Sequence, residues 1–179
     1  MNILMLADYH HECAAVIDHI RGIIKTSKHN YTIINPIRNQ YPLRSIECFD
    51  AILIHYSIYI IHGIFLSRRY KRLIAEFEGY KIQFAQDEYR EVSKLAEEMA
   101  NLGIDALFTL YARDQMDKVY DQPHLKNLIK IKTLTGYVPS TLSQIKSLPI
   151  SCRERHIGYR GRSLPFWLGK LAQEKKLIS

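Results

Sequence analysis

Six short apolar runs alternate with longer stretches of helical spacing, and this alternation constrains the fold more than any other feature of the sequence. The runs are rich in Ile, Leu and Phe, as buried parallel strands are; they span residues 2–7, 31–35, 51–55, 80–85, 104–110 and 128–133. Between them, the spacing predicts helices at 13–24, 59–78, 92–102 and 112–120. This order predicts an α/β fold: a doubly wound, mostly parallel Rossmann-like sheet with helices on both faces.

Charge divides the chain unevenly. Residues 1–150 hold 18 Lys and Arg against 16 Asp and Glu, whereas residues 151–179 hold 7 against 2. We therefore predict a domain over residues 1–150 and a compositionally distinct segment over 151–179. A generally basic nucleic-acid-binding surface is disfavoured, because the excess charge is confined to the end of the chain.

The sequence predicts a cytoplasmic protein. Cys13, Cys48 and Cys152 are widely spaced and form no CxxC pair, which favours reduced thiols. Asp8 interrupts the first apolar run before a signal-peptide core could form. The apolar run 51–66 is shorter than the roughly 20 residues of a membrane-spanning helix. The basic residues Arg68, Arg69, Lys71 and Arg72 follow it, as a solvated helix face or as a peripheral contact with an anionic inner-membrane surface.

Polar clusters follow three of the predicted strands, at residues 8–12, 55–57 and 86–90. The carboxyl ends of parallel strands face one common crevice, so residues distant in sequence converge there. The sequence therefore predicts one ligand site built from these loops.

The first cluster, Asp8, Tyr9, His10, His11 and Glu12, places two imidazoles beside two carboxylates, which suits a general base near neutral pH. The alternative is that Asp8 caps the next helix and the histidines are solvated. A metal site at His10, His11 and Glu12 is a weaker interpretation, because adjacent histidines rarely reach one ion. We expect no metal and no cofactor.

The later clusters also allow two interpretations. Gln86, Asp87, Glu88, Tyr89 and Arg90 could bind the hydroxyls of a sugar-like ligand, or Asp87 or Glu88 could cap the following helix with Arg90 as an ion-pair partner. After the third strand, His55 and Tyr56 are either ligand contacts or, as is commoner for a lone histidine, residues of the core.

Three common catalytic motifs are absent from the sequence: the phosphate-binding loop GxxxxGK[ST], the dinucleotide fingerprint GxGxxG and the hydrolase elbow GxSxG. Kinase, dehydrogenase and α/β-hydrolase activities are thereby disfavoured.

Several segments in order resemble the N-terminal domain of GT-B glycosyltransferases of the retaining, bacterial polysaccharide type. They are MNILMLADYHHECAAVIDHI, FDAILIHYS, KIQFAQDEYR, IDALFTLYA and IKIKTLTGYVP. HIGYRGRSLPFWLGKLAQEKK then resembles the start of the second, donor-side domain, so the resemblance spans nearly the whole chain. The Gly-Tyr-Val-Pro turn departs from the Asn-Gly-Val-Asp-like turn that is usual in that family.

The resemblance implies roles for matching residues. His10, His11 and Asp87 would be catalytic-cleft residues. Acceptor-binding residues would be Asp8, Tyr9, Glu12, His55, Tyr56, Gln86, Glu88, Tyr89 and Arg90. Arg160 and Arg162 would bind the diphosphate of a nucleotide sugar, the co-substrate, and the acceptor would be a glycan or a lipid-linked saccharide.

The resemblance also implies that residues 151–179 are the beginning of a truncated second domain, so we expect no transferase activity from this chain alone. Phe166, Trp167, Leu168 and Leu171 form an apolar helical face that would dock on the first domain or, as a homodimer, on another copy. The alternative function is a stand-alone Rossmann-like binding or regulatory module that uses the same crevice without catalysis.

Overall fold

The computed structural model describes residues 1–39, 45–89, 91–134 and 144–154. The chain divides into two compact units, Met1–Pro139 and Ser140–Ser179. The predicted segment 151–179 lies largely outside the described residues. In the second unit, the described residues 144–154 include the 3-10 helix η4 (Ile150–Cys152).

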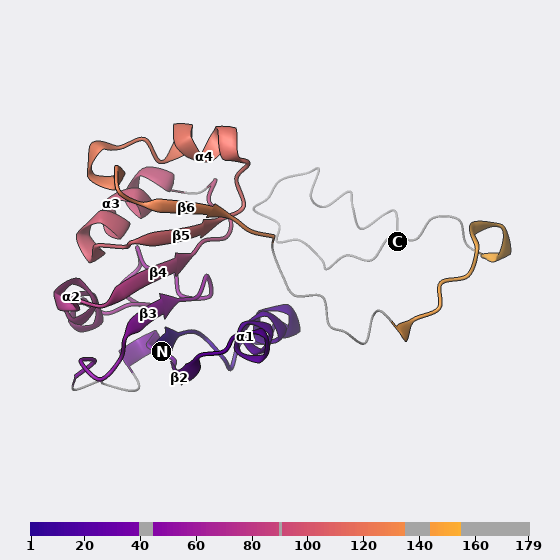
Figure 1. The fold of residues 1–179 in the computed structure, drawn as a ribbon, viewed down its shortest axis with the longest axis horizontal. Coiled ribbons are helices and arrows are strands. Elements are labelled where there is room, and N and C mark those ends of the chain that lie inside the picture. Colours follow the sequence, from indigo (N-terminus) through magenta and orange to yellow (C-terminus); the bar gives the residue numbers. More distant parts are fainter. Residues whose placement is uncertain (40–44, 90, 135–143, 155–179) are drawn as a thin grey trace. The chain divides into compact units, whose positions relative to one another are not determined.

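The first unit is built on a six-stranded sheet in the order β2-β1-β3-β4-β5-β6 (Figure 1). The strands are β1 (Asn2–Leu6), β2 (Asn30–Ile34), β3 (Ala51–Ile54), β4 (Tyr80–Phe84), β5 (Ala106–Thr109) and β6 (Ile129–Lys132). All five neighbouring pairs are parallel, which confirms the predicted α/β class and parallel sheet.

Four α-helices connect these strands: α1 (Ala14–Thr26), α2 (Arg68–Glu76), α3 (Val92–Leu102) and α4 (Arg113–Val119). Short 3-10 helices, η1 (Ile37–Asn39) and η2 (Pro123–Leu125), complete the connections. Figure 1 shows α1 on the opposite side of the sheet from α2 and α3, as in a doubly wound fold.

Alternate residues of β1 build the two cores. Leu4 and Leu6 point into the larger core beneath α2, α3 and α4, whereas Ile3 and Met5 pack with Val16 of α1. A strand buried on both faces must be apolar at nearly every position, which explains why the strand runs were recognisable in the sequence.

The predicted helix over 59–78 is wrong in its first half. Residues 58–66 form turns in which Ile58, Ile60 and Leu66 are buried. The helix begins only at Arg68, because Ser67 serves as its N-cap and accepts a hydrogen bond from the Tyr70 N–H. By contrast, α3 has the predicted bounds and ends against Gly103, which adopts a left-handed conformation with φ 67°.

Candidate functional site

The strand order changes direction between β1 and β3. From β1 the chain crosses to β2 at one side, and β3 then pairs with the other side of β1. In open α/β sheets, the crevice outside the carboxyl ends of two such strands is the usual position of a ligand. The loops after β1 and β3 are therefore the structural starting point for a site, and they carry two of the predicted polar clusters.

Asp8 ties together the loops that follow β1, β2 and β3. Its Oδ1 accepts a hydrogen bond of 2.7 Å from Nδ2 of Asn35, a buried residue directly after β2. Its backbone N–H donates to Ser57 Oγ at 2.9 Å. The alternative that Asp8 caps α1 is wrong, because Cys13 is the N-cap and makes no side-chain cap bond. Asp8 is thus held in place by residues from two other loops, those after β2 and β3.

A chain of hydrogen bonds continues from Ser57 into the core. Ser57 Oγ lies 2.9 Å from His55 Nδ1, and His55 Nε2 lies 2.8 Å from Nδ1 of His19 on α1. The Ser57 backbone N–H also donates to His55 Nδ1, so this nitrogen accepts and the proton of the neutral ring is on Nε2. His55 therefore donates to His19, and His19 carries its own proton on Nε2.

Burial keeps both imidazoles neutral. Burial, followed by the nearby His19 and His11, lowers the pKa of His55 to about 3, and burial also lowers the pKa of His19. Tyr56 packs on the His55 ring, with centroids 4.0 Å apart, and its pKa is raised by burial and by Cys13. The side chain of His55 is wholly buried, so it supports the crevice from below, as the core interpretation of this residue expected.

The remainder of the first cluster faces outward. His10, His11 and Glu12 are exposed, and the Tyr9 ring packs against that of His10 at 4.2 Å. His11 Nδ1 accepts a hydrogen bond from the Cys13 backbone N–H. Within this first cluster, His10, His11 and Glu12 are therefore the residues best placed to meet a dissolved ligand.

Glu88 points inward, away from solvent. Its carboxylate accepts hydrogen bonds from the Thr109 hydroxyl at 2.7 and 2.8 Å, from the Leu110 N–H at 3.0 Å and from the Tyr120 hydroxyl. Burial and then the Glu88 carboxylate raise the pKa of the Tyr120 phenol, which stays protonated as a donor. The side chain of Glu88 is thus committed to joining the loops after β4 and β5 to the end of α4.

The rest of this turn is solvent-accessible. Asp87 is exposed and has φ 56°, and the side chain of Tyr89 is 76% exposed. Neither Asp87 nor Glu88 caps α3, whose N-cap is Glu91 without a side-chain cap bond. A depression of about 280 Å³ lies here, lined by Asp87, Glu88, Tyr89, Leu110, Tyr111 and Gln115. Arg90 lies outside the described residues.

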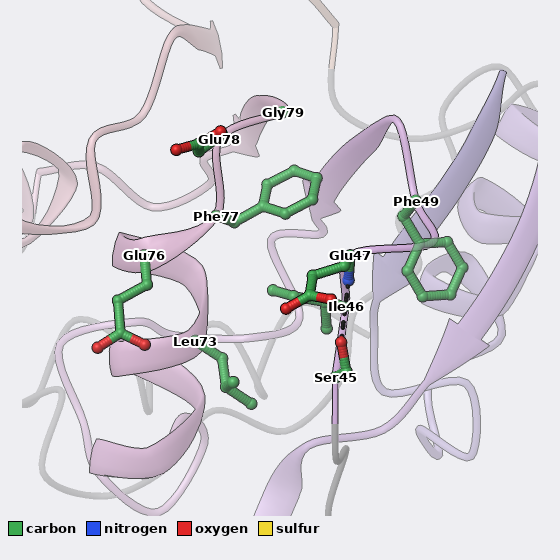
Figure 2. Close-up of a pocket in the computed structure, with 9 residues that line it drawn as sticks. All are labelled: Ser45, Ile46, Glu47, Phe49, Leu73, Glu76, Phe77, Glu78 and Gly79. Carbon is green, nitrogen blue, oxygen red and sulfur yellow. Dashed lines mark hydrogen bonds between the residues drawn. The ribbon is translucent and has the colours of Figure 1, made fainter.

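A hollow of about 520 Å³ lies at the opposite end of the strands (Figure 2). Ser45, Ile46, Glu47 and Phe49 precede β3, and Leu73, Glu76, Phe77, Glu78 and Gly79 join the end of α2 to β4. Among its described lining residues, the carboxylates are those of Glu47, Glu76 and Glu78, and none of these described residues is cationic. Because the hollow lies at the amino ends of β3 and β4, it is not part of the crevice that the strand order indicates.

The basic residues near α2 are partly engaged. Lys71 pairs with Glu98 at 2.9 Å, while Arg72 approaches Glu76 at 4.0 Å; Arg68 and Arg69 are exposed. Arg160 and Arg162 lie outside the described residues. Among the residues that the structure describes, no helix has the length and apolar character needed to cross a membrane, and no cluster of three His, Cys, Asp or Glu side chains could hold a metal ion.

Four residues of the site were not predicted from the sequence: His19, Asn35, Thr109 and Tyr120. Asn35 is the polar last residue of the predicted strand 31–35, and its position could have indicated a role at the carboxyl end of the sheet. His19 offered a weaker signal, as a titratable residue among the apolar residues of a predicted helix. Their partners lie 20 to 50 positions away, roughly, which no local pattern encodes.

Comparisons of this chain with protein-family models, with curated proteins and with solved structures found no match.

Proposed function

We propose that residues 1–139 form the acceptor-side domain of a GT-B-type glycosyltransferase of the retaining, bacterial polysaccharide type. The crevice at the β1/β3 switch point would receive a glycan or a lipid-linked saccharide, and a nucleotide sugar would be the co-substrate. One observation carries the proposal: Asp8, held by Asn35 and Ser57, lies where the strand order reverses in a parallel sheet.

The chemistry of the crevice suits a polyhydroxylated ligand. A sugar hydroxyl both donates and accepts, so it is bound best by side chains of both kinds that are already oriented. Asp8 offers an acceptor whose position is fixed by the Asn35 amide. Tyr9 and Tyr56 are partly exposed and add aromatic faces beside it, against which the apolar side of a pyranose ring can pack.

Proton transfer in this proposal belongs to the exposed imidazoles. Histidine is the side chain best suited to proton transfer near neutral pH. His10 and His11 lie in the loop after β1 and are open to solvent, whereas His55 is buried and its pKa is lowered to about 3. We therefore assign the general base to His10 or His11. The exposed Asp87 would be a further carboxylate of the cleft, beside Asp8.

In this proposal the donor side includes the segment 151–179. Arg160 and Arg162 would bind the donor diphosphate through bidentate guanidinium contacts. A peripheral membrane contact through the exposed Arg68 and Arg69, with Lys71 and Arg72, belongs to the same proposal.

The test measures binding of three methyl pyranosides, the glucoside, the galactoside and the mannoside. Saturation-transfer NMR detects this binding. We expect at least one to bind wild-type protein and to bind Asp8→Asn about tenfold more weakly, because the charge is lost while an oxygen remains for Asn35. Asp121→Asn, at an exposed carboxylate, is the control and should bind like wild type. Absence of binding by all three pyranosides, together with stabilisation by unrelated metabolites, would instead favour a non-catalytic module.

A further inference from the structure

Gln83 is a polar side chain in the larger core near the carboxyl end of β4. It is 3% exposed, and its neighbours across the sheet are Ile54 and Leu107. Its Nε2 donates a hydrogen bond to the backbone carbonyl of Phe84. This bond fixes the orientation of the amide, because the flipped side chain would place two carbonyl oxygens against each other.

The Gln83 Oε1 atom is buried and has no hydrogen-bond partner among the described residues. A buried acceptor without a donor is destabilising, so such an atom in a folded protein calls for a donor that the described residues do not supply. The packing of β4 does not require an amide at position 83, since the paired residues of the neighbouring strands, Ile54 and Leu107, are apolar.

Gln83 lines a small cavity. It is lined by Tyr56, Ile58, Tyr59, Ile60, Gln83, Phe84, Ala85, Gln86 and Leu95. The space open to the centre of a water-sized group is about 10 Å³, which is about the minimum for a single water. Tyr56 and Gln86 are only partly buried and belong to the loops after β3 and β4, so the cavity adjoins the proposed ligand crevice.

We propose that Gln83 Oε1 is a subsite for one hydroxyl donor. A water occupies it in the free protein, and a hydroxyl of the ligand replaces that water when the crevice is filled. The ligand part of this inference rests on the proposed function, because a hydroxyl-rich ligand is needed to supply the group. Gln83 is then a specificity-determining residue: a ligand that lacks this hydroxyl leaves a buried acceptor unpaired.

The experiment follows the side-chain amide signal of Gln83 in ¹⁵N-labelled protein, assigned by its loss in Gln83→Met. Methanol is the smallest probe with the required O–H, and the three methyl pyranosides are the second set. Gln122→Met is the matched control variant, because Gln122 Oε1 is also buried without a partner and its Nε2 also donates to a backbone carbonyl, that of Val119. We expect both probe sets to shift the Gln83 signal and to leave the Gln122 signal unchanged.

Affinity supplies the second measurement. The pyranoside that binds wild type should bind Gln83→Met at least tenfold more weakly and Gln122→Met equally well. Its deoxy analogue without the recognised hydroxyl should bind wild type and Gln83→Met alike. Because Met has the same length and no polar atoms, Gln83→Met removes the unpaired acceptor without opening a large cavity, and folding of the variant is checked by its thermal unfolding.

The outcomes separate the subsite from the proposed function. A Gln83 signal unmoved by methanol and by every pyranoside overturns the subsite. Pyranoside binding that shifts the Asp8 and Ser57 amides, but is equal in wild type and Gln83→Met, overturns the subsite and keeps the function. A shift with methanol, without any pyranoside binding, supports the hydroxyl-donor site and overturns the glycosyltransferase proposal.

Discussion

His55 Nε2 lies 2.8 Å from Nδ1 of His19 and donates to it, which joins the end of β3 to the middle of α1 across the β1/β3 switch point. Through Ser57 the same chain reaches the backbone of Asp8. The conformation of the first polar loop therefore depends on two buried imidazoles that remain neutral.

Stability should fall as the pH drops below about 6.5. The unfolded His55 has an ordinary histidine pKa, whereas burial lowers its folded value to about 3, so the unfolded state binds more protons between these two values. The stabilising contribution is complete above pH 6.5 and is lost as the pH falls towards 3, by roughly 1 kcal/mol per pH unit. Urea unfolding at pH 7.5, 6, 5 and 4 measures this slope. His55→Asn should make the free energy of unfolding less dependent on pH, whereas His124→Asn, at an exposed histidine, should not. A pH dependence in His55→Asn equal to that of wild type would contradict the role of His55.

Removing one of the groups that donate hydrogen bonds to Glu88 should destabilise the fold, although no surface residue is changed. Tyr120→Phe deletes a buried hydroxyl that donates to Glu88 and leaves the carboxylate short of a partner. We expect a loss of about 1–3 kcal/mol in the free energy of unfolding, measured by urea denaturation at pH 7.5. Tyr89→Phe removes a hydroxyl from an exposed side chain of the same turn and should change stability by less than about 0.5 kcal/mol. Equal midpoints for the two variants would argue against the buried role of Glu88.

Ser57→Ala should loosen the loop after β1. The variant leaves the Asp8 N–H without its acceptor and removes a partner of His55 Nδ1. Hydrogen exchange of the Asp8 amide should accelerate about fivefold, because loss of a single hydrogen bond of about 1 kcal/mol permits local opening. Ser93→Ala, at an exposed position of α3, is the control. Unchanged protection of Asp8 in Ser57→Ala would show that the loop is held by other contacts.

Two glycines near α2 should respond differently to alanine. A Cβ at Gly79 would lie 2.4 Å from Phe77 Cζ and 2.6 Å from the Asp50 backbone oxygen, whereas a Cβ at Gly63 would have nothing within 4 Å. Because the backbone oxygen cannot move aside without disturbing the start of β3, Gly79→Ala should cost about 1–3 kcal/mol. Gly63→Ala should stay within about 0.5 kcal/mol of wild type. Similar thermal midpoints for both variants would rule out the close approach at Gly79.

The local sequence pattern was sufficient to predict two kinds of element: strands buried on both faces, and helices that end at a specific residue. The strand β1 was recognised because both of its faces are covered, and α3 because Gly103 supplies the left-handed residue that ends it. The helix over 59–78 was misjudged, because the apolar residues Ile58 and Ile60 are buried in turns and mimic the start of a helix.

The sequence by itself determined the parallel α/β architecture and the placement of polar residues after β1, β3 and β4, since burial dictates apolar strands and the loops receive the rest. Only the tertiary structure decided which of those residues face inward. Glu88 is held by Thr109 and Tyr120, and His55 by His19, through contacts between elements distant in the chain. A loop has no periodicity from which such directions can be read, so the division between supporting residues and exposed ones arises from packing alone.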